Sequence, residues 1–265
     1  MPTLSFITAN YVARAKQYDG NDDWGYHDTA TRRSMSLSSW SDIVVDIKNA
    51  GFLAADLWMA HCDPLAHTTQ YRDAVLATCA ENNLRLTSYA GGLSLNEPRD
   101  AERYLPWIRS LGIDTFAGGL WGNLASGDFA PAMNDLFAKH GLRWAYENHP
   151  EKSVEEILKK IGGGKHRNIG VALDTGWCGT QGMDALDAVK RVREHLFLLH
   201  LKDVKKIGGH DTCTLGDGVV GIESIVRYLK ETKFDGTICI EHEPYDHDPT
   251  DDVIESAKRV EQWLA

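Results

Sequence analysis

The sequence has 265 residues, of which 43% are hydrophobic and 25% are charged, and its formal net charge is −10. A chain of this length can bury a full core without disulfide bonds or a structural metal ion. The acidic balance argues against an extended nucleic-acid-binding surface, because such a surface needs clustered lysine and arginine side chains.

Eight short apolar runs alternate with longer amphipathic segments along the chain. In chain order, the predicted strands are Leu4–Ala9, Ala54–Met59, Arg85–Ala90, Thr115–Gly119, Leu142–Glu147, Asn168–Asp174, Leu196–Leu201 and Thr237–Glu241. The predicted helices that follow them are Ser39–Ala50, Tyr71–Asn82, Glu97–Leu111, Pro131–His140, Ser153–Ile161, Met183–His195, Ile222–Thr232 and Thr250–Leu264. Because a helix follows each strand, we expect parallel strands joined by right-handed crossovers.

Eight strand–helix repeats favour closure into a single (β/α)8 TIM barrel over residues 1–265, a fold that typically takes about 250 residues. An open doubly wound sheet is the alternative. It is weakened because no G-x-G-x-x-G motif follows the first strand, where the polar segment 14–33 stands instead. The two longest segments without clear periodicity, 11–36 and 204–220, are predicted to be loops. In a barrel, loops that follow strands lie on the catalytic face.

Local signals mark the ends of several predicted helices. Glycines stand where a left-handed residue would end a helix, at Gly51, Gly112, Gly141 and Gly162. At the start of another helix, Ser153 is followed three residues later by Glu156, which predicts a capping box.

Each of the last four predicted strands ends with a side chain able to bind metal, namely Glu147, Asp174, His200 and Glu241. A charged group at this end of a barrel strand is typical of a catalytic site. Side chains alternate between the two faces of a strand, and Asp174, Glu147 and Glu241 share their faces with small residues that suit the barrel interior. The pattern is weaker for His200, which shares its face with two leucines.

The four strand ends would bring three carboxylates and one imidazole to one point. Without a counter-charge, the carboxylates would repel each other and raise each other's pKa values. A divalent cation relieves this repulsion, so the pattern predicts a shared metal site. The oxygen and nitrogen ligands suit Mn²⁺, Mg²⁺, Co²⁺ or Zn²⁺.

The segments YENH, LDTGW, HLKD and IEHE around these residues resemble the xylose isomerase-like TIM-barrel superfamily, in particular its sugar (phosphate) isomerase/epimerase branch. The resemblance covers essentially the whole chain and includes Asp-Leu-Trp at residues 56–58 and Gly-Asp-Gly at residues 216–218. It implies that Glu147, Asp174, His200 and Glu241 are metal ligands, with Mn²⁺ as the first expectation. It also implies that Glu147 and Glu241 act as the acid and the base.

Six further residues near the strand ends are candidates for substrate binding. They are Trp58, His61, His149, Trp177, Lys202 and Asp203. The two tryptophans could stack on a sugar face, and Lys202 could meet a hydroxyl or an anionic group. Asp203 could instead orient His200 or brace the next loop. Many relatives have histidine in place of Trp177, and ketose-handling relatives often have an arginine soon after Asp203, where this chain has Lys205 and Lys206.

The predicted function is a divalent-metal-dependent sugar isomerase or epimerase that moves a proton between two glutamates through an enediolate. A lyase, deglycosidase or dehydratase acting on a keto-sugar or 3-keto-glycoside is the alternative, since it would need the same acidified proton. An abasic-site endonuclease and a non-catalytic sugar-binding barrel are further alternatives. The net charge of −10 counts against the nuclease, and the eight tryptophans favour a neutral carbohydrate or glycoside over a small acid.

The remaining features concern location and partners. The five cysteines form no CxxC pair, and residues 1–12 lack a basic start followed by an apolar run. No apolar stretch approaches the roughly 18 residues of a membrane span. We therefore expect a cytoplasmic protein with reduced thiols that binds a small sugar or glycoside and neither nucleic acid nor membrane. The resemblance leaves a homo-oligomer or a partner subunit open.

Overall fold

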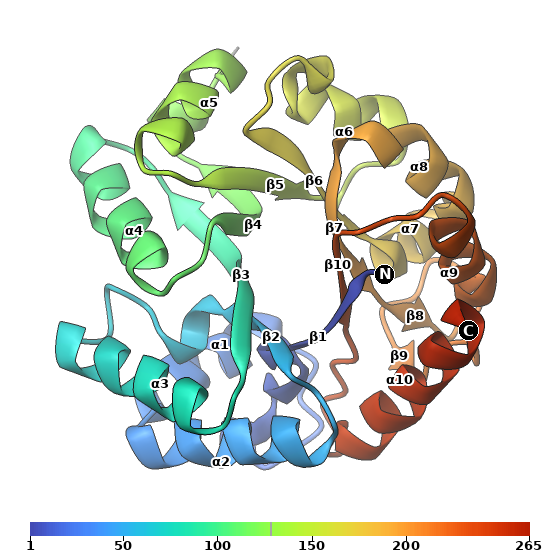
Figure 1. Ribbon diagram of the computed structural model, residues 1–265, viewed down its shortest axis with the longest axis horizontal. Helices are drawn as coiled ribbons and strands as arrows, with labels where there is room; N and C mark the ends of the chain where they lie inside the picture. Colours follow the sequence, from blue (N-terminus) through green and yellow to red (C-terminus); the bar gives the residue numbers. More distant parts are fainter. Residues whose placement is uncertain (128) are drawn as a thin grey trace.

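The computed structural model describes residues 1–127 and 129–265, and its centre is a closed barrel of eight parallel strands (Figure 1). Around the barrel the strand order is β1-β10-β7-β6-β5-β4-β3-β2. The strands are β1 (Thr3–Ile7), β2 (Ala54–Trp58), β3 (Arg85–Ser94), β4 (Thr115–Trp121), β5 (Arg143–Glu147), β6 (Ile169–Asp174), β7 (Leu196–Leu201) and β10 (Thr237–Ile240). The predicted (β/α)8 barrel is confirmed, and the open sheet is excluded.

Eight of the described helices, one after each barrel strand, form the outer ring seen in Figure 1. They are α2 (Leu37–Asn49), α3 (Thr69–Glu81), α4 (Pro98–Ser110), α5 (Ala130–Lys139), α6 (Val154–Lys160), α8 (Ala185–Val192), α9 (Ile222–Glu231) and α10 (Thr250–Leu264). Each matches a predicted helix to within a few residues. None of the described helices is long and apolar enough to cross a membrane.

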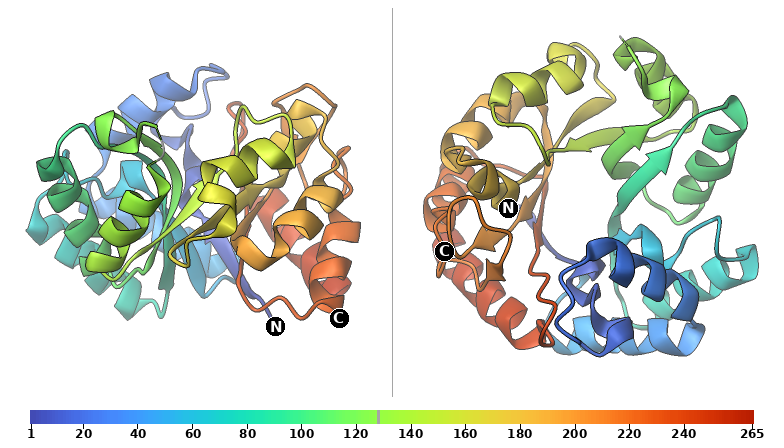
Figure 2. Two further views of the ribbon diagram at one scale, coloured as in Figure 1. Left: turned by 90° about the horizontal axis from the view of Figure 1, so that it is seen from above. Right: turned by 180° about the vertical axis from the view of Figure 1, so that it is seen from behind.

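The predicted loop 11–36 was wrong in part, because it contains helix α1 (Trp24–Ser34). Asp23 caps this helix by accepting a hydrogen bond from the backbone N–H of Tyr26. The helix is polar on most sides and has only two buried residues, so it lacks the apolar period that reveals the other helices. Figure 2, left, shows α1 at the end of the barrel opposite the two chain termini, over the mouth.

The predicted loop 204–220 is likewise partly ordered, since β8 (Asp203–Val204) and β9 (Thr212–Cys213) form a short antiparallel pair there. A second unexpected helix, α7 (Thr175–Gln181), begins directly after β6. Both elements stand at the same end of the barrel as α1. This end of the barrel is therefore more structured than the sequence pattern indicated.

The buried residues divide into a large cluster between barrel and helices and a small cluster inside the barrel. The inner cluster contains Ala117, Ala145, Ala172 and Cys239, whereas bulky neighbours on the same strands, such as Trp144, belong to the outer cluster. The predicted alternation of small inward and bulky outward residues is thus confirmed. Small inner residues leave room at the mouth for the longer side chains at the strand ends.

The predicted helix ends are confirmed at Gly51, Gly112, Gly141 and Gly162, which all have positive φ angles between 66° and 89°. Ser153 caps α6 by accepting a hydrogen bond from the N–H of Glu156. The Glu156 carboxylate, however, accepts from the N–H of Lys152 rather than from that of Ser153. The predicted capping box is therefore only half formed.

Candidate metal centre and active site

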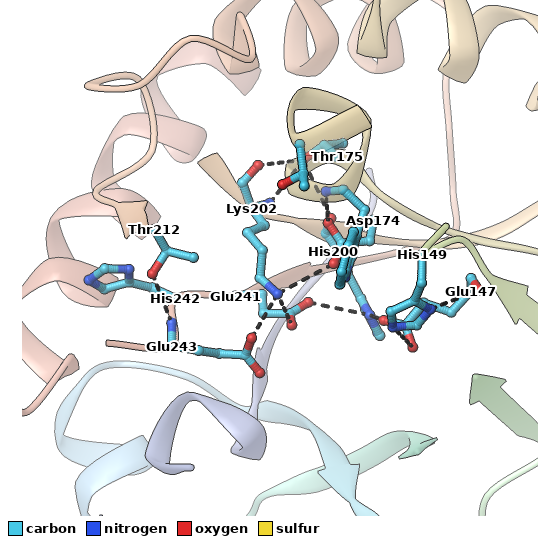
Figure 3. Close-up of polar contacts among 12 residues, drawn as sticks. Glu147, His149, Asp174, Thr175, His200, Lys202, Thr212, Glu241, His242 and Glu243 are labelled. Carbon is cyan, nitrogen blue, oxygen red and sulfur yellow. Dashed lines mark hydrogen bonds and ion pairs between the residues drawn. The ribbon is translucent and has the colours of Figure 1, made fainter. Parts of the chain in front are cut away.

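Three of the four predicted ligands converge at the mouth of the barrel (Figure 3). Nδ1 of His200 lies 2.5 Å from Oε1 of Glu147 and 3.4 Å from Oε2 of Glu241. One ligand atom from each of these residues lies within 4.8 Å of the others. All three side chains are buried, because they stand at the inward positions of β5, β7 and the end of β10.

Asp174 stands at the end of β6 and is linked to Glu241 by Lys202, which contacts both carboxylates. Its Oδ1 accepts a hydrogen bond from the backbone N–H of Trp177 at 2.9 Å and thereby caps α7. Its Oδ2 lies 3.4 Å from Nζ of Lys202. The same ammonium group lies 2.7 Å from Oε1 of Glu241 and 2.7 Å from Oε2 of Glu243 (Figure 3). Lys202 is thus the counter-charge of three carboxylates.

Burial and charge act in opposite directions on the pKa values of this group. Burial would raise the pKa of Glu147, but the adjacent His200 and His149 outweigh it and lower the pKa to about 2. Burial raises the pKa of Asp174 to about 6, although Lys202 opposes the shift. For His200 and Lys202, burial is outweighed by the surrounding carboxylates, and both pKa values are raised.

Asp56 of β2 is a member of the site that the sequence reasoning did not single out. Its Oδ2 lies 3.0 Å from Nε2 of His200, so each ring nitrogen of His200 faces a carboxylate. A metal-binding histidine commonly donates its second ring N–H to such a carboxylate, which fixes the orientation of the ring. The alternation of side chains along β2 could have revealed Asp56, because it puts Asp56 on the same inward face as Trp58.

The residues present fit a divalent cation. Oε2 of Glu241 is buried and has no hydrogen-bond partner among the described residues, although it points at the group formed with His200 and Glu147. A buried carboxylate oxygen without a partner is costly, and a cation would remove that cost. Glu147, His200 and Glu241 would hold the ion, and Asp174 would join them if its contact with Lys202 were exchanged for the metal.

A cavity of about 1140 Å³ opens above the carboxylates. Its charged floor includes Glu147, Asp174, Lys202, Glu241 and Glu243. Its walls include the aromatic side chains Trp24, Trp58, Trp121, Trp177 and Tyr245. An aromatic wall beside polar groups is the combination that carbohydrate rings require, since they have apolar faces and a polar edge.

Four of the six candidate substrate-binding residues line this cavity, namely Trp58, His149, Trp177 and Lys202. The rings of His149 and Trp177 form an edge-to-face pair with centroids 5.1 Å apart. His149 is also close to the centre, with its Nε2 3.9 Å from Oε2 of Glu147. These residues surround the group that would do the chemistry.

His61 and Asp203 are not among the residues that line the cavity. His61 is buried behind Trp58, with its Nδ1 2.9 Å from Oγ1 of Thr8. Burial lowers the pKa of His61 to about 3. Asp203 accepts hydrogen bonds from four backbone N–H groups of the following loop, those of Val204, Gly216, Gly218 and Val220. Asp203 therefore braces this loop, which was one of the roles predicted for it, and it does not line the cavity as a substrate-binding residue would.

Comparison with known families gives the class of the protein. The chain matches the xylose isomerase-like TIM barrel family over residues 44–263 and belongs to that family. No functionally curated protein matches the sequence.

Several solved structures are similar to this chain at low sequence identity. The D-allulose 3-epimerase from Methylomonas sp. in complex with D-allulose is 16% identical, with a TM-score of 0.71, and the match covers 98% of this chain and 96% of the epimerase. The probable 3-DHS dehydratase AsbF from Bacillus anthracis is 16% identical, with a TM-score of 0.69 and coverage of 97% and 98%. A xylose isomerase-like TIM barrel protein from Mycobacterium smegmatis in complex with magnesium is 16% identical, with a TM-score of 0.69 and coverage of 88% and 91%. These likenesses concern the fold.

Proposed function

We propose that this chain is a divalent-metal-dependent sugar isomerase or epimerase. The observation that carries the proposal is the convergence of Glu147 and Glu241 on His200 at the floor of a cavity with aromatic walls. The fold shared with an epimerase that binds D-allulose supports the substrate class. The fold shared with a barrel that binds magnesium supports a divalent cation, with Mn²⁺ as our first choice.

The proposed reaction needs two proton-transfer groups near a carbon next to a carbonyl. A bound divalent cation would polarise the carbonyl and thereby acidify that carbon. Glu147 must be ionised to act as a base, and a divalent cation bound beside it would favour the ionised form. Oε1 of Glu241 accepts from the Lys202 ammonium group, so this carboxylate has a proton donor beside it. Transfer of a proton between the glutamates through the substrate gives isomerisation or epimerisation.

Other residues of the mouth would orient the sugar. Trp58 and Trp177 present aromatic faces, and His149 stands beside Glu147 at the edge of the cavity. The Lys202 ammonium group can donate hydrogen bonds to a hydroxyl oxygen in addition to its carboxylate partners. In this arrangement the sugar ring would lie between an aromatic wall and a polar floor.

A lyase or dehydratase acting on a keto-sugar or a 3-keto-glycoside is the second candidate. The size of the cavity favours it, because about 1140 Å³ exceeds the range of roughly 300–1,000 Å³ that is usual for small-molecule sites. A substrate with a second group beyond the sugar ring would use this space. The fold shared with a probable dehydratase supports the same candidate.

Solvent hydrogen exchange tests the proposal for both candidates. The protein would be incubated with Mn²⁺ in D₂O together with free ketoses or 3-keto-glycosides, and products would be analysed by NMR and mass spectrometry. An isomerase or epimerase places deuterium in a rearranged sugar, whereas a lyase releases water or the aglycone. Chelator-treated protein should do neither. Lack of exchange with every substrate in the presence of Mn²⁺ would contradict the proposal.

A further inference from the structure

A second group of metal-binding side chains lies on the outer side of the connection between β10 and α10. Along this extended segment, Glu241 and Glu243 point into the mouth, and His242 between them points the other way (Figure 3). His242 is only 3% exposed, and its backbone N–H donates to Oδ1 of Asn10 at 2.8 Å. Because consecutive side chains of this extended segment point in opposite directions, the segment contributes side chains to two separate sites.

The His242 ring meets two other potential ligands, one in the same connection and one at the start of α10. Nε2 of His242 lies 3.3 Å from Oδ2 of Asp252, and Nε2 of His247 lies 3.0 Å from the same oxygen. All three ligand atoms lie within 4.8 Å of one another. Ligands about 2.0–2.1 Å from a tetrahedral Zn²⁺ ion are about 3.4 Å apart, close to both measured contacts.

We propose that His242, His247 and Asp252 form a zinc-binding site that is separate from the active site. Two imidazoles and one carboxylate, with a fourth position left for water, are a frequent ligand set for Zn²⁺. The active site differs, because three carboxylates and one imidazole favour harder ions such as Mn²⁺ or Mg²⁺. The two sites would therefore differ in metal preference.

Further contacts hold the three ligands in position. Nδ1 of His247 lies 2.6 Å from Oδ1 of Asp246, and Oδ1 of Asp252 accepts from Oγ1 of Thr214 at 3.0 Å. Carboxylate partners of this kind orient metal-binding histidines and make them stronger ligands. Zinc would join the connection after β10 to the first turn of α10. It would thereby fix the segment that carries Glu243 and Tyr245, two residues of the mouth.

Zinc stoichiometry provides the test. Metal-free protein would be titrated with Zn²⁺ against a chromophoric chelator, and retained zinc would be measured by mass spectrometry after dialysis. We expect the wild type to retain one equivalent more than His247→Ala and Asp252→Asn, whether or not the active site also takes zinc. Asp251→Asn is the matched control, because it removes the same charge from the same first turn of α10 and should retain as much zinc as the wild type. Asp246→Asn should weaken the second site by about 10- to 100-fold while leaving its ligands in place.

Two results would overturn the proposal. One is a wild type that holds zinc only at the active site, which would mean that His242, His247 and Asp252 form a hydrogen-bonded group only. The other is retention of the full wild-type amount of zinc by both His247→Ala and Asp252→Asn, with circular dichroism verifying that the variants are folded. Anomalous diffraction at the zinc edge would locate the ion. The readout is metal content rather than turnover, so the result does not depend on the proposed enzymatic function.

Discussion

The two sides of the barrel mouth differ in chemistry. The side formed by β2 to β4 presents Trp58, Trp121 and two glycines, and the Trp121 ring lies so close over Gly92 and Gly119 that a Cβ at either would collide with it. The side formed by β5 to β10 carries the glutamates, Asp174, His200 and Lys202. The difference indicates that the strands of the first half of the chain present a flat apolar surface, whereas the strands of the second half supply most of the charged groups.

The largest expected effect is on the charged side, from removing a proton-transfer group. Glu147→Gln and Glu241→Gln should each lower kcat by about 10³-fold or more, since acid–base catalysis contributes roughly 10²–10⁴-fold and each change also removes a metal ligand. Turnover would be measured at saturating Mn²⁺, together with metal content. Glu261→Gln, an exposed change on α10, is the matched control and should behave as wild type. Activity within tenfold of wild type in both site variants would contradict the assignment.

Removing the internal counter-ion should have the next largest effect. Lys202→Met leaves the carboxylates of Asp174, Glu241 and Glu243 without their shared partner. Breaking a buried ion pair on one side costs about 3–5 kcal/mol, and the free energy of unfolding of the metal-free protein should fall by about 3 kcal/mol. A cation would replace part of the lost positive charge, so Mn²⁺ should restore part of the stability. Urea unfolding with and without Mn²⁺ measures both effects, and an equal loss in the two conditions would refute this role of the metal.

The third effect concerns Asp56, a carboxylate on the apolar side that contacts His200 on the charged side. Asp56→Asn would keep the size of the side chain but replace the carboxylate that faces Nε2 of His200 with a neutral amide. We expect the affinity for Mn²⁺ to fall by about 10- to 100-fold. The control is Ser88→Ala, because Ser88 is the register partner of Asp56 in β3 and its hydroxyl has no hydrogen-bond partner among the described residues. Calorimetric titration with Mn²⁺ would compare the variants. Equal affinities would mean that Asp56 is a packing residue only.

The contrast between the two sides also explains which parts of the site the sequence could predict. Alternation along a strand predicted the inward positions of Glu147, Asp174 and Glu241, because it depends only on neighbours in the sequence. It was weaker for His200, and the structure gives a reason. The pairing of β6 with β7 shifts register between Val171 and Ala172, so that Leu198 joins the inner cluster and Leu196 the outer one.

Long-range contacts could not be predicted in this way. Lys202 reaches Glu243 across 41 positions in the sequence, and Asp56 reaches His200 across 144. The role of Asp203 depends on N–H groups from residues 204 to 220, whose conformation is set by the loop itself. Helix α1 was missed because its polar sequence depends on a cap and on tertiary packing rather than on an apolar face.

On the apolar side, the buried His61 predicts a pH dependence of stability. Its pKa is about 3 in the folded protein and about 6.5 in the unfolded chain, so between these values the unfolded chain binds a proton that the folded protein does not. The contribution of His61 to the free energy of unfolding is complete above about pH 6.5. Below that pH it is lost by about 1.4 kcal/mol per pH unit. Urea unfolding of the wild type and His61→Gln from pH 7 to pH 4.5 would measure this. The variant should have the shallower slope, and parallel curves would contradict the prediction.

The smallest expected effect tests the apolar wall itself. Trp121 is 59% exposed at the rim, so its replacement should leave the core and the unfolding midpoint unchanged. Trp121→Ala would remove the surface above Gly92 and Gly119 and should raise KM about fivefold, corresponding to about 1 kcal/mol of stacking, with kcat retained. Trp121→Phe keeps a flat ring in place and should stay close to wild type. A kcat loss in Trp121→Ala without a change in KM would mean that this side of the mouth takes part in the reaction, and the division between a binding side and a reacting side would then be wrong.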